Sequence, residues 1–401
     1  MNLDRIRQDF PILSNSDIIY FDNACTTLKP NSVIEAVSQY YRELPFCDRG
    51  NYRLSKMVGE KCEKVRQQTA KFINASKPSE IIFLKNATEG INLVANSLDF
   101  QEGDIVLTSD KEHNSNFLPW LKLANQNKIK HLITKTTDDG EFDLEDFKAQ
   151  LEKNQGNIKL VSLVYTSNLD GATYPVREII EFAHKHKALV LLDATQAATH
   201  QRIDVRKSGV DFLVFSAHKM LGPTGVGVLY LKKEIVDNFT PSVIGGGTVS
   251  NASYTDYELL PSPQRFEAGI QNYSGIFGFG AALDYLNSIG MENIEKQNLV
   301  LNKYISENLL SLPNIRLIGP PEPEKRSGII SFYVKGVDPH YIAQLLESSG
   351  NIAIRSGQLC VHSWFSDKEV KGVIRISTYF YNTMAEAEKL IKQIKNILRI
   401  L

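Results

Sequence analysis

Short apolar runs that alternate with helix-like segments are the feature of this 401-residue chain that most restricts its fold. A run of this length, followed by a helix-like segment, predicts a strand that is buried on both faces of a largely parallel sheet. We therefore expect an α/β domain with helices on both faces of its sheet. The runs that support this expectation are Glu80 to Leu84, Asp104 to Thr108, Lys159 to Val164, Leu189 to Asp193, Phe212 to Phe215 and Val226 to Leu231.

Two segments interrupt this pattern. From Gly245 to Pro263 the sequence is irregular and rich in glycine, serine and proline, which predicts a long ordered loop or lid. Periodic structure resumes from Gly275 to Ile289. The proline-rich segment Gly319 to Ser327 predicts a surface turn between two strands.

The last quarter of the chain has a different organisation. From about residue 295 onward, short strands such as Gly328 to Val334 and Val373 to Ser377 mix with helices, as expected of a smaller α+β domain. Thr383 and Glu386 form a capping box at the start of a final amphipathic helix.

Charge and hydropathy argue against two classes of partner. With 45 basic and 46 acidic residues, the chain has no basic excess for binding nucleic acid or an anionic membrane. The apolar runs are far shorter than the roughly 18 residues of a membrane span. The first residues also lack the apolar stretch of a secretory signal, so we expect a soluble cytoplasmic protein.

The four cysteines are spread too widely for a zinc motif or a dense disulfide framework. We therefore expect reduced thiols and no metal site. Cys25, Cys47 and Cys62 are interpreted as small buried hydrophobic residues. Cys360 differs, because Arg355 and His362 lie close to it in the sequence and would favour its thiolate form.

Ionisable side chains gather where two neighbouring strands are expected to end. Asp193 and Gln196 follow one buried run, and Ser216, His218 and Lys219 follow the next. Ligands bind at such carboxyl ends of parallel strands. A desolvated lysine there is a nucleophile toward an aldehyde, and pyridoxal phosphate (PLP) is the aldehyde that enzymes commonly hold in this way.

PLP has further needs that nearby residues can meet. Asp193 can counter the pyridine nitrogen, while Ser216, His218 and the helix N-terminus at Thr88 can bind the phosphate. His113 is placed to stack on the ring. Taken singly, Ser216 to Lys219 could be a helix cap and a solvated lysine, Asp193 a cap, and His113 a loop histidine. Nucleotide-binding glycine motifs are absent, and Gly222 to Gly227 is interpreted as a turn because it leads into a strand.

The chain resembles the class V group of fold-type I PLP enzymes, and within it the SufS-type cysteine desulfurases, from about residue 17 to its end. The resemblance rests on these motifs: Phe21-Asp-Asn-Ala24, Ala87-Thr-Glu-Gly-Ile-Asn-Leu-Val-Ala95, Glu112-His113, Pro119-Trp120, Ser167-Asn168, Asp193-Ala-Thr-Gln196, Ser216-Ala-His-Lys-Met-Leu-Gly-Pro-Thr-Gly-Val-Gly227, Arg265-Phe-Glu-Ala-Gly269, Arg355-Ser-Gly-Gln-Leu-Cys360 and Tyr381-Asn-Thr383. It implies an N-terminal segment 1–20 that packs with the small domain, a large PLP-binding domain 21–290 and a small domain 291–401 carrying Cys360.

The resemblance also implies roles for individual residues. Lys219 would be the Schiff-base lysine, Asp193 the pyridinium partner and His113 the stacking residue. Gln196 would contact the phenolic oxygen, and Thr88, Ser216 and His218 would hold the phosphate. Asn168, Arg355 and Arg375 would bind the substrate, with Asn168 and Arg375 binding its carboxylate, and Asn168 would also contact the cofactor. Cys360 would accept sulfur from L-cysteine.

The implied protein is a homodimer that turns L-cysteine into L-alanine and passes the sulfur to an acceptor protein for iron–sulfur cluster assembly. Five of the residues depart from the family pattern. Ile270 replaces a threonine that reaches the neighbouring subunit's phosphate, Asp48 and Asn114 replace histidines, and Asn86-Ala87 replaces Gly-Thr. These departures leave the substrate preference, the rate and the sulfur acceptor open.

Three other interpretations remain at this point. One is a different PLP enzyme on the same scaffold, such as an aminotransferase, an epimerase or a selenocysteine lyase. Another is a non-catalytic sulfur carrier that has lost PLP. The last is a thiol hydrolase built on Cys360 and His362.

Overall fold

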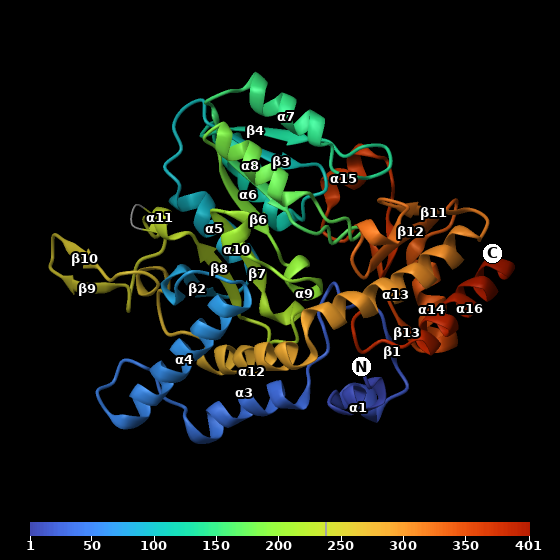
Figure 1. The fold of residues 1–401 in the computed structure, drawn as a ribbon, viewed down its shortest axis with the longest axis horizontal. Coiled ribbons are helices and arrows are strands. Elements are labelled where there is room, and N and C mark those ends of the chain that lie inside the picture. Colours follow the sequence, from blue (N-terminus) through green and yellow to red (C-terminus); the bar gives the residue numbers. More distant parts are fainter. Residues whose placement is uncertain (237–238) are drawn as a thin grey trace.

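A twisted seven-stranded sheet forms the centre of the molecule in the computed structural model, which describes residues 1–236 and 239–401 (Figure 1). Only β8 runs antiparallel to its neighbours, so the prediction of a mostly parallel sheet is confirmed. The strands lie in the order β2 (Ile81–Leu84), β8 (Gly227–Leu231), β7 (Phe212–Ser216), β6 (Leu189–Asp193), β5 (Ile158–Val164), β3 (Ile105–Ser109) and β4 (Lys130–Thr134).

Helices cover both faces of this sheet. Successive side chains of a strand point to opposite sides, so both faces carry apolar side chains that the helices bury. In β7, Leu213 and Phe215 pack on one face, whereas Phe212 and Val214 pack on the other. The first face carries α3 (Asn31–Glu43), α4 (Arg53–Phe72), α7 (Leu144–Lys153), α8 (Val176–Lys185) and α12 (Tyr273–Ile289). The second carries α5 (Ala87–Ser97) and α6 (Asn114–Asn125).

A second, antiparallel sheet belongs to the C-terminal part of the chain. Its strands follow the order β11 (Ile315–Ile318), β12 (Ile329–Val334), β15 (Val373–Ser377) and β14 (Arg355–Gly357). Its separate apolar core includes side chains of α13 (Met291–Leu310), α14 (Pro339–Gly350) and α16 (Met384–Ile400), while α15 (His362–Asp367) belongs to a smaller cluster. The predicted capping box of Thr383 and Glu386 is present at the start of α16.

The N-terminal residues contact this C-terminal part. β1 (Ile19–Tyr20) pairs in parallel with β13 (Ile352–Ala353), and Arg7 forms an ion pair with Glu386. Asp22 bridges to Ser377 next to these pairings. The division into segments 1–20, 21–290 and 291–401 stays a prediction.

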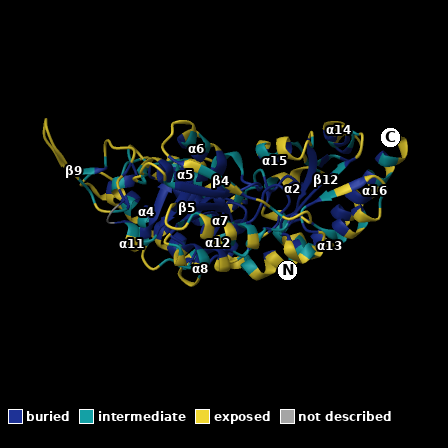
Figure 2. Cartoon of the chain, turned by 90° about the horizontal axis from the view of Figure 1, so that it is seen from above, coloured by how far each residue is buried: buried dark blue, intermediate teal, exposed yellow. Residues whose placement is uncertain are grey.

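The region expected to be a loop contains a β-hairpin. Its strands β9 (Val249–Ala252) and β10 (Tyr257–Leu259) pair in antiparallel fashion and project from the body of the molecule (Figure 1). Figure 2 shows the exposed hairpin at one end of the molecule, away from the buried centre of the large sheet. The hairpin was not expected because its residues are largely polar and exposed and carry no apolar run.

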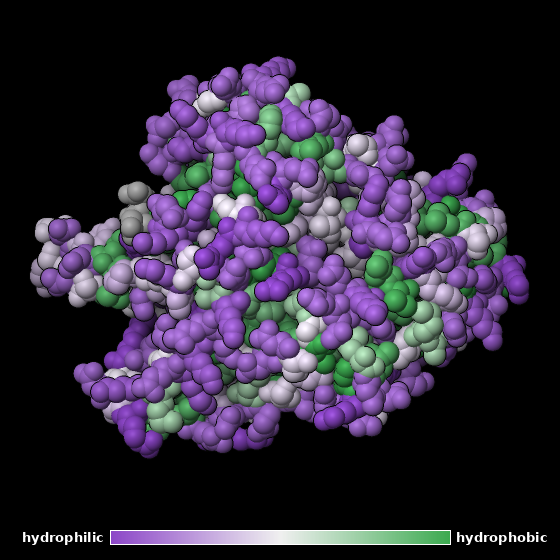
Figure 3. Space-filling model, in the orientation of Figure 1, coloured by the Kyte–Doolittle hydropathy of each residue, from purple (hydrophilic) through white to green (hydrophobic). Residues whose placement is uncertain are grey.

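The remaining helical elements are short and join the main ones. They are α1 (Leu3–Gln8), α2 (Pro11–Asn15), α9 (Ala197–His200), α10 (Val205–Ser208), α11 (Lys233–Val236), η1 (Pro78–Glu80), η2 (Ala217–Lys219), η3 (Gln264–Phe266) and η4 (Pro323–Lys325). Among the described residues, no helix has the length and apolar character needed to cross a membrane. The face in Figure 3 is mostly hydrophilic, with small separate groups of apolar side chains.

Candidate active site

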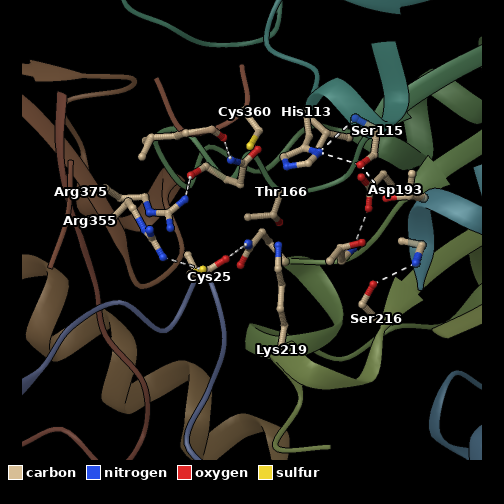
Figure 4. Close-up of a pocket in the computed structure, with 18 of the residues that line it drawn as sticks. Cys25, His113, Ser115, Thr166, Asp193, Ser216, Lys219, Arg355, Cys360 and Arg375 are labelled. Atoms are coloured by element: carbon tan, nitrogen blue, oxygen red, sulfur yellow. Dashed lines mark hydrogen bonds between the residues drawn. The ribbon is translucent and has the colours of Figure 1, made fainter. Parts of the chain in front are cut away.

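A crevice of about 520 Å³ opens at the carboxyl ends of the parallel strands, where the C-terminal part of the chain meets the large sheet (Figure 4). This placement follows from the fold, because the loops after β3, β5, β6 and β7 all end at the same edge. The structure brings every predicted site residue to this crevice: Thr88, His113, Asn168, Asp193, Gln196, Ser216, His218, Lys219, Arg355, Cys360 and Arg375.

Lys219 and Asp193 supply the opposite charges of the crevice. Lys219 ends η2, directly after β7, and burial lowers the pKa of its amine to about 8. Asp193 ends β6 with 5% of its surface exposed, and burial raises the pKa of its carboxyl group. The charge of Asp193 opposes the effect of burial on Lys219, so the two groups influence each other across the crevice.

These positions remove two of the simpler interpretations. The low pKa of Lys219 does not fit a solvated lysine. The residue that caps α9 is Gln196, whereas Asp193 accepts a hydrogen bond from the backbone N–H of Thr195 at 3.0 Å. Asp193 is therefore not the cap of that helix.

His113 forms the N-cap of α6. Its Nδ1 accepts a hydrogen bond from the backbone N–H of Ser115 at 3.1 Å, which leaves the ring proton on Nε2. The hydroxyl of Ser115 lies 2.7 Å from that of Thr88, at the start of α5. Burial and the nearby Lys219 lower the pKa of His113 to about 3, so its ring is neutral.

Two arginines share one carboxylate at the C-terminal side of the crevice. Asp22 accepts from Arg355 at 2.7 Å and from Arg375 at 3.2 Å. Arg375 is 3% exposed, whereas the side chain of Arg355 is 44% exposed. Arg355 Nη2 also donates to the sulfur of Cys25 at 2.8 Å, so two positive charges face one carboxylate and one thiol.

Cys360 is exposed on a loop at the rim of the crevice. Leu359 and Cys360 both have left-handed backbone angles, φ 52° and 58°, which non-glycine residues rarely adopt. Two hydrogen bonds hold this strained turn. The carbonyl of Leu359 accepts from Asn168 Nδ2 at 2.9 Å, and the carbonyl of Cys360 accepts from the backbone N–H of Asn114 at 2.7 Å.

Several crevice residues fit a polar aromatic ligand such as PLP. Asn168 Oδ1, Thr195 Oγ1, Gln196 Oε1 and Arg375 Nε are buried and have no hydrogen-bond partner among the described residues. Buried polar atoms normally have partners, so a set of unpartnered atoms around one crevice indicates a polar ligand. Ser216 Oγ accepts from the backbone N–H of Ala87 at 2.9 Å, which ties β7 to the start of α5 and leaves the hydroxyl proton for a phosphate oxygen.

Sequence reasoning missed part of the site. The interpretation of Cys25 as a buried hydrophobic residue was wrong, because Cys25 lines the crevice and contacts Arg355. Its place next to the Phe21 to Ala24 motif was the available signal. Cys47 is also only partly buried, whereas Cys62 is buried as expected. Ser115 and Thr166 are further crevice residues that carried no signal of their own.

Two of the unusual positions lie away from this crevice. Asp48 accepts a hydrogen bond from the Tyr273 hydroxyl at 2.7 Å, and Ile270 is 64% exposed. Neither is among the residues that line the crevice. Within residues 1–236 and 239–401, no group of three or more potential metal ligands occurs.

The comparisons with known proteins agree over almost the whole chain. The family described as aminotransferase class-V matches residues 19–390. A probable cysteine desulfurase of Pyrococcus abyssi is 38% identical over 400 residues, which cover 99% of this chain and 98% of that protein. A cysteine desulfurase of Escherichia coli is 34% identical over 409 residues, covering 100% of this chain and 99% of that protein.

Solved structures show the same likeness. The apo structure of a cysteine desulfurase from Thermococcus onnurineus NA1 has a TM-score of 0.94 and 37% identity, with 99% of this chain and 98% of that chain covered. The Escherichia coli cysteine desulfurase CsdA, in an S-sulfonic acid form, has a TM-score of 0.90 and 29% identity, with 100% and 99% covered. The fold-type I architecture is thus confirmed, and the chain belongs to the class V aminotransferase family.

Proposed function

We propose that this protein is a PLP-dependent cysteine desulfurase, which converts L-cysteine to L-alanine and keeps the sulfur as a persulfide on Cys360. The observation that carries the proposal is that one crevice combines a low-pKa amine, a buried carboxyl group and an exposed thiol, in Lys219, Asp193 and Cys360. Relatives named as cysteine desulfurases over nearly the full chain support it.

The buried side of the crevice is proposed to hold the cofactor. PLP supplies an aldehyde for an amine and a ring that accepts electrons from the substrate. Lys219, half unprotonated near pH 8, would provide that amine, and neutral His113 would pack on the ring. Asp193 would face the ring nitrogen, where a positive charge would offset the burial that raises its pKa. Gln196 would contact the phenolic oxygen, and the set Thr88, Ser216 and His218 would bind the phosphate.

The arginine side is proposed to bind the substrate. Arg375 carries a buried Nε without a partner among the described residues, and this group can donate to the carboxylate of cysteine. Arg355, the more exposed of the two arginines that pair with Asp22, would contact the substrate from the opening of the crevice. Asn168 already donates to the Leu359 carbonyl, so it would position the Cys360 loop as well as face the substrate.

The proposed reaction balances without an external oxidant. The amine of Lys219 removes the proton from the substrate Cα, and the Cys360 sulfur attacks the substrate sulfur. The bond from Cβ to sulfur breaks and a sulfur–sulfur bond forms. Cβ gains a proton, for which the Cys360 thiol is the net source, and Cα takes back the proton that it lost to Lys219. L-cysteine and a thiol thus become L-alanine and a persulfide.

We extend the proposal to the biological setting that the resemblance implies. The protein would be a SufS-type enzyme, a cytoplasmic homodimer that delivers sulfur to an acceptor protein for iron–sulfur cluster assembly. The exposed position of Cys360 supports transfer to a partner, because a persulfide there can be reached from outside. The domain division at residues 21–290 and 291–401 would let the Cys360 loop meet the sheet edge from the smaller unit.

Intact-mass analysis after incubation with L-cysteine tests the proposal. We expect the protein to gain the mass of one sulfur atom and to release L-alanine. Cys360→Ser should gain no sulfur, whereas Cys47→Ser, which changes a partly exposed thiol outside the crevice, should behave as the unchanged protein. Undiminished cysteine turnover by Cys360→Ser would refute the proposal and favour another PLP reaction.

A further inference from the structure

A second cavity, of about 160 Å³, lies between α9 and α13 and shares none of its lining residues with the crevice. Figure 1 shows these two helices next to each other, below the large sheet. The lining residues come from α9, α13, η4 and the loop after β5. They are Thr173, His200, Gln201, Glu295, Asn298, Leu299, Glu324, Arg326 and Ser327.

Arg326 is the buried cation of this second cavity. It is 4% exposed, and its Nη2 donates to Ser306 Oγ at 2.8 Å. Its Nε and Nη1 are buried without a hydrogen-bond partner among the described residues. Burying unpaired guanidinium N–H groups costs free energy. We therefore expect a ligand in the cavity to supply a hydrogen-bond acceptor for Arg326.

Other hydrogen-bond donors around the cavity also lack an acceptor. Asn298 Nδ2 lies 2.9 Å from His200 Nδ1, so Nδ1 is the acceptor and the ring proton sits on Nε2. That Nε2 has no partner in the described part of the chain, and neither do Gln201 Nε2 and Ser327 Oγ. Burial lowers the pKa of His200 to about 3, so the ring offers a neutral donor. The cavity wall thus presents hydrogen-bond donors that lack an acceptor.

The charges at the rim define the ligand further. Glu295 and Glu324 line the cavity with exposed carboxylates, and neither forms an ion pair with any residue that the structure describes. The other carboxylates near Arg326 are already paired, Asp170 with Lys111 and Glu322 with Lys325. One buried cation behind two rim carboxylates favours a monoanion that also carries a positive group, and it disfavours a phosphate dianion.

We infer that the second cavity binds a small zwitterionic α-amino acid. Its carboxylate would lie against Arg326, His200 and Ser327, and its ammonium group would lie between Glu295 and Glu324. The volume suits a ligand of the size of alanine. This site is separate from the crevice proposed to bind cysteine and does not depend on the proposed reaction.

The test uses L-alanine as the probe and the purified holoprotein. A crystal structure after soaking in L-alanine shows whether the ligand occupies the second cavity. Titration calorimetry gives its affinity there as the part of the binding signal that the variants of this cavity change, because the crevice is also proposed to bind L-alanine. Arg326→Met should weaken binding there by at least about tenfold, because a hydrogen-bonded charge is lost. Propionate, which lacks the ammonium group, and inorganic phosphate should both bind more weakly than L-alanine.

Exposed variants keep the test decisive if Arg326→Met does not fold. Glu324→Gln should weaken L-alanine binding by about two- to fivefold, the size of a rim ion pair. Glu322→Gln is the matched control, since Glu322 lies two positions away and outside the lining, and it should leave the affinity unchanged. Ordered water alone in the cavity, equal effects of the two glutamine variants, or tighter binding of phosphate or propionate would each overturn the inference.

Discussion

The two walls of the crevice differ in burial, and the difference matches their chemistry. On the sheet wall, Asp193 and Ser216 end their strands, Gln196 caps the short helix after β6, and all three are at most 5% exposed. On the C-terminal wall, Arg375 is buried, but Arg355 and Cys360 are exposed, and Cys360 lies in a turn with left-handed backbone angles. Burial is what lowers the pKa of an amine, whereas the thiol that we propose to pass sulfur to another protein must stay accessible. One crevice therefore needs two kinds of wall.

Removing the amine of the sheet wall should have the largest effect. Lys219→Ala is expected to abolish the visible absorbance of lysine-bound PLP and to lower L-alanine formation by at least about 10³-fold. Absorbance spectra and alanine release measure the two effects. Lys85→Ala, at an exposed position after β2, is the control and should change neither. A variant at position 219 that keeps both properties would contradict the assignment.

Removing the thiol of the C-terminal wall should separate the two walls. Cys360→Ser is expected to lower sulfur release from L-cysteine by at least about 10²-fold while keeping the absorbance of bound PLP. Cys62→Ser should show the opposite pattern: a hydroxyl in the buried site of Cys62 costs about 1–3 kcal/mol of stability but leaves sulfur release intact. Thermal unfolding and sulfide assays measure both. Loss of bound PLP in Cys360→Ser would show that the walls are not independent.

The pH dependence of PLP uptake tests the burial of the sheet wall. Since only the unprotonated amine captures an aldehyde, and the pKa of Lys219 is about 8, uptake by apo-protein should fall about tenfold for each pH unit below 8 and level off above it. Stopped-flow absorbance measures this profile. Asp193→Asn removes a charge that raises this pKa, so the midpoint should move to lower pH. A midpoint near that of free lysine would contradict the effect of burial.

A smaller change removes a side-chain contact next to the turn of the C-terminal wall. Asn114 Nδ2 lies 2.8 Å from His362 Nδ1, beside Cys360. Asn114→Ala should slow sulfur transfer about fivefold, the value of one neutral hydrogen bond, and leave PLP binding unchanged. Steady-state sulfide release measures the effect, with the exposed Asn96→Ala on α5 as control. Equal rates in both variants would show that this contact does not position Cys360.

The smallest expected effect concerns Cys25. Cys25→Ala removes the sulfur contact of Arg355 but keeps its ion pair with Asp22, so KM for L-cysteine should change by only about twofold and kcat should stay constant. Steady-state kinetics compare this variant with Cys47→Ala. A large fall in kcat would instead show that Cys25 takes part in the sulfur step.

The sequence predicted those elements whose burial produces a recognisable pattern of apolar residues. Leu189–Asp193 was predicted from an apolar run and Val373–Ser377 as a short strand, and both appear as strands with the expected bounds. β4 (Lys130–Thr134) was missed because its exposed edge position lets lysine and histidine replace apolar residues. The hairpin of β9 and β10 was missed for a similar reason, since neither of its strands is part of a core.

The residues of the crevice were predictable where the chemistry requires a certain residue type. The proposed reaction sets such requirements at Lys219, Asp193 and Cys360, and the structure brings all three to one crevice. Cys25 and the second cavity were not predictable, because their contacts are made with residues that lie far away in the sequence. Arg326 and His200 are ordinary residues in the sequence and become unusual only when α9 and α13 bury them together.

The ion pair between Asp22 and Arg375 has a consequence for how this protein is made. Its partners lie 353 residues apart, so the crevice cannot assemble until nearly all of the chain has been synthesised. Contacts of such long range form slowly, because a large loop must close first. The strands of the large sheet can collapse earlier. The nascent protein would then contain the buried amine of Lys219 before Cys360 has been brought to the crevice.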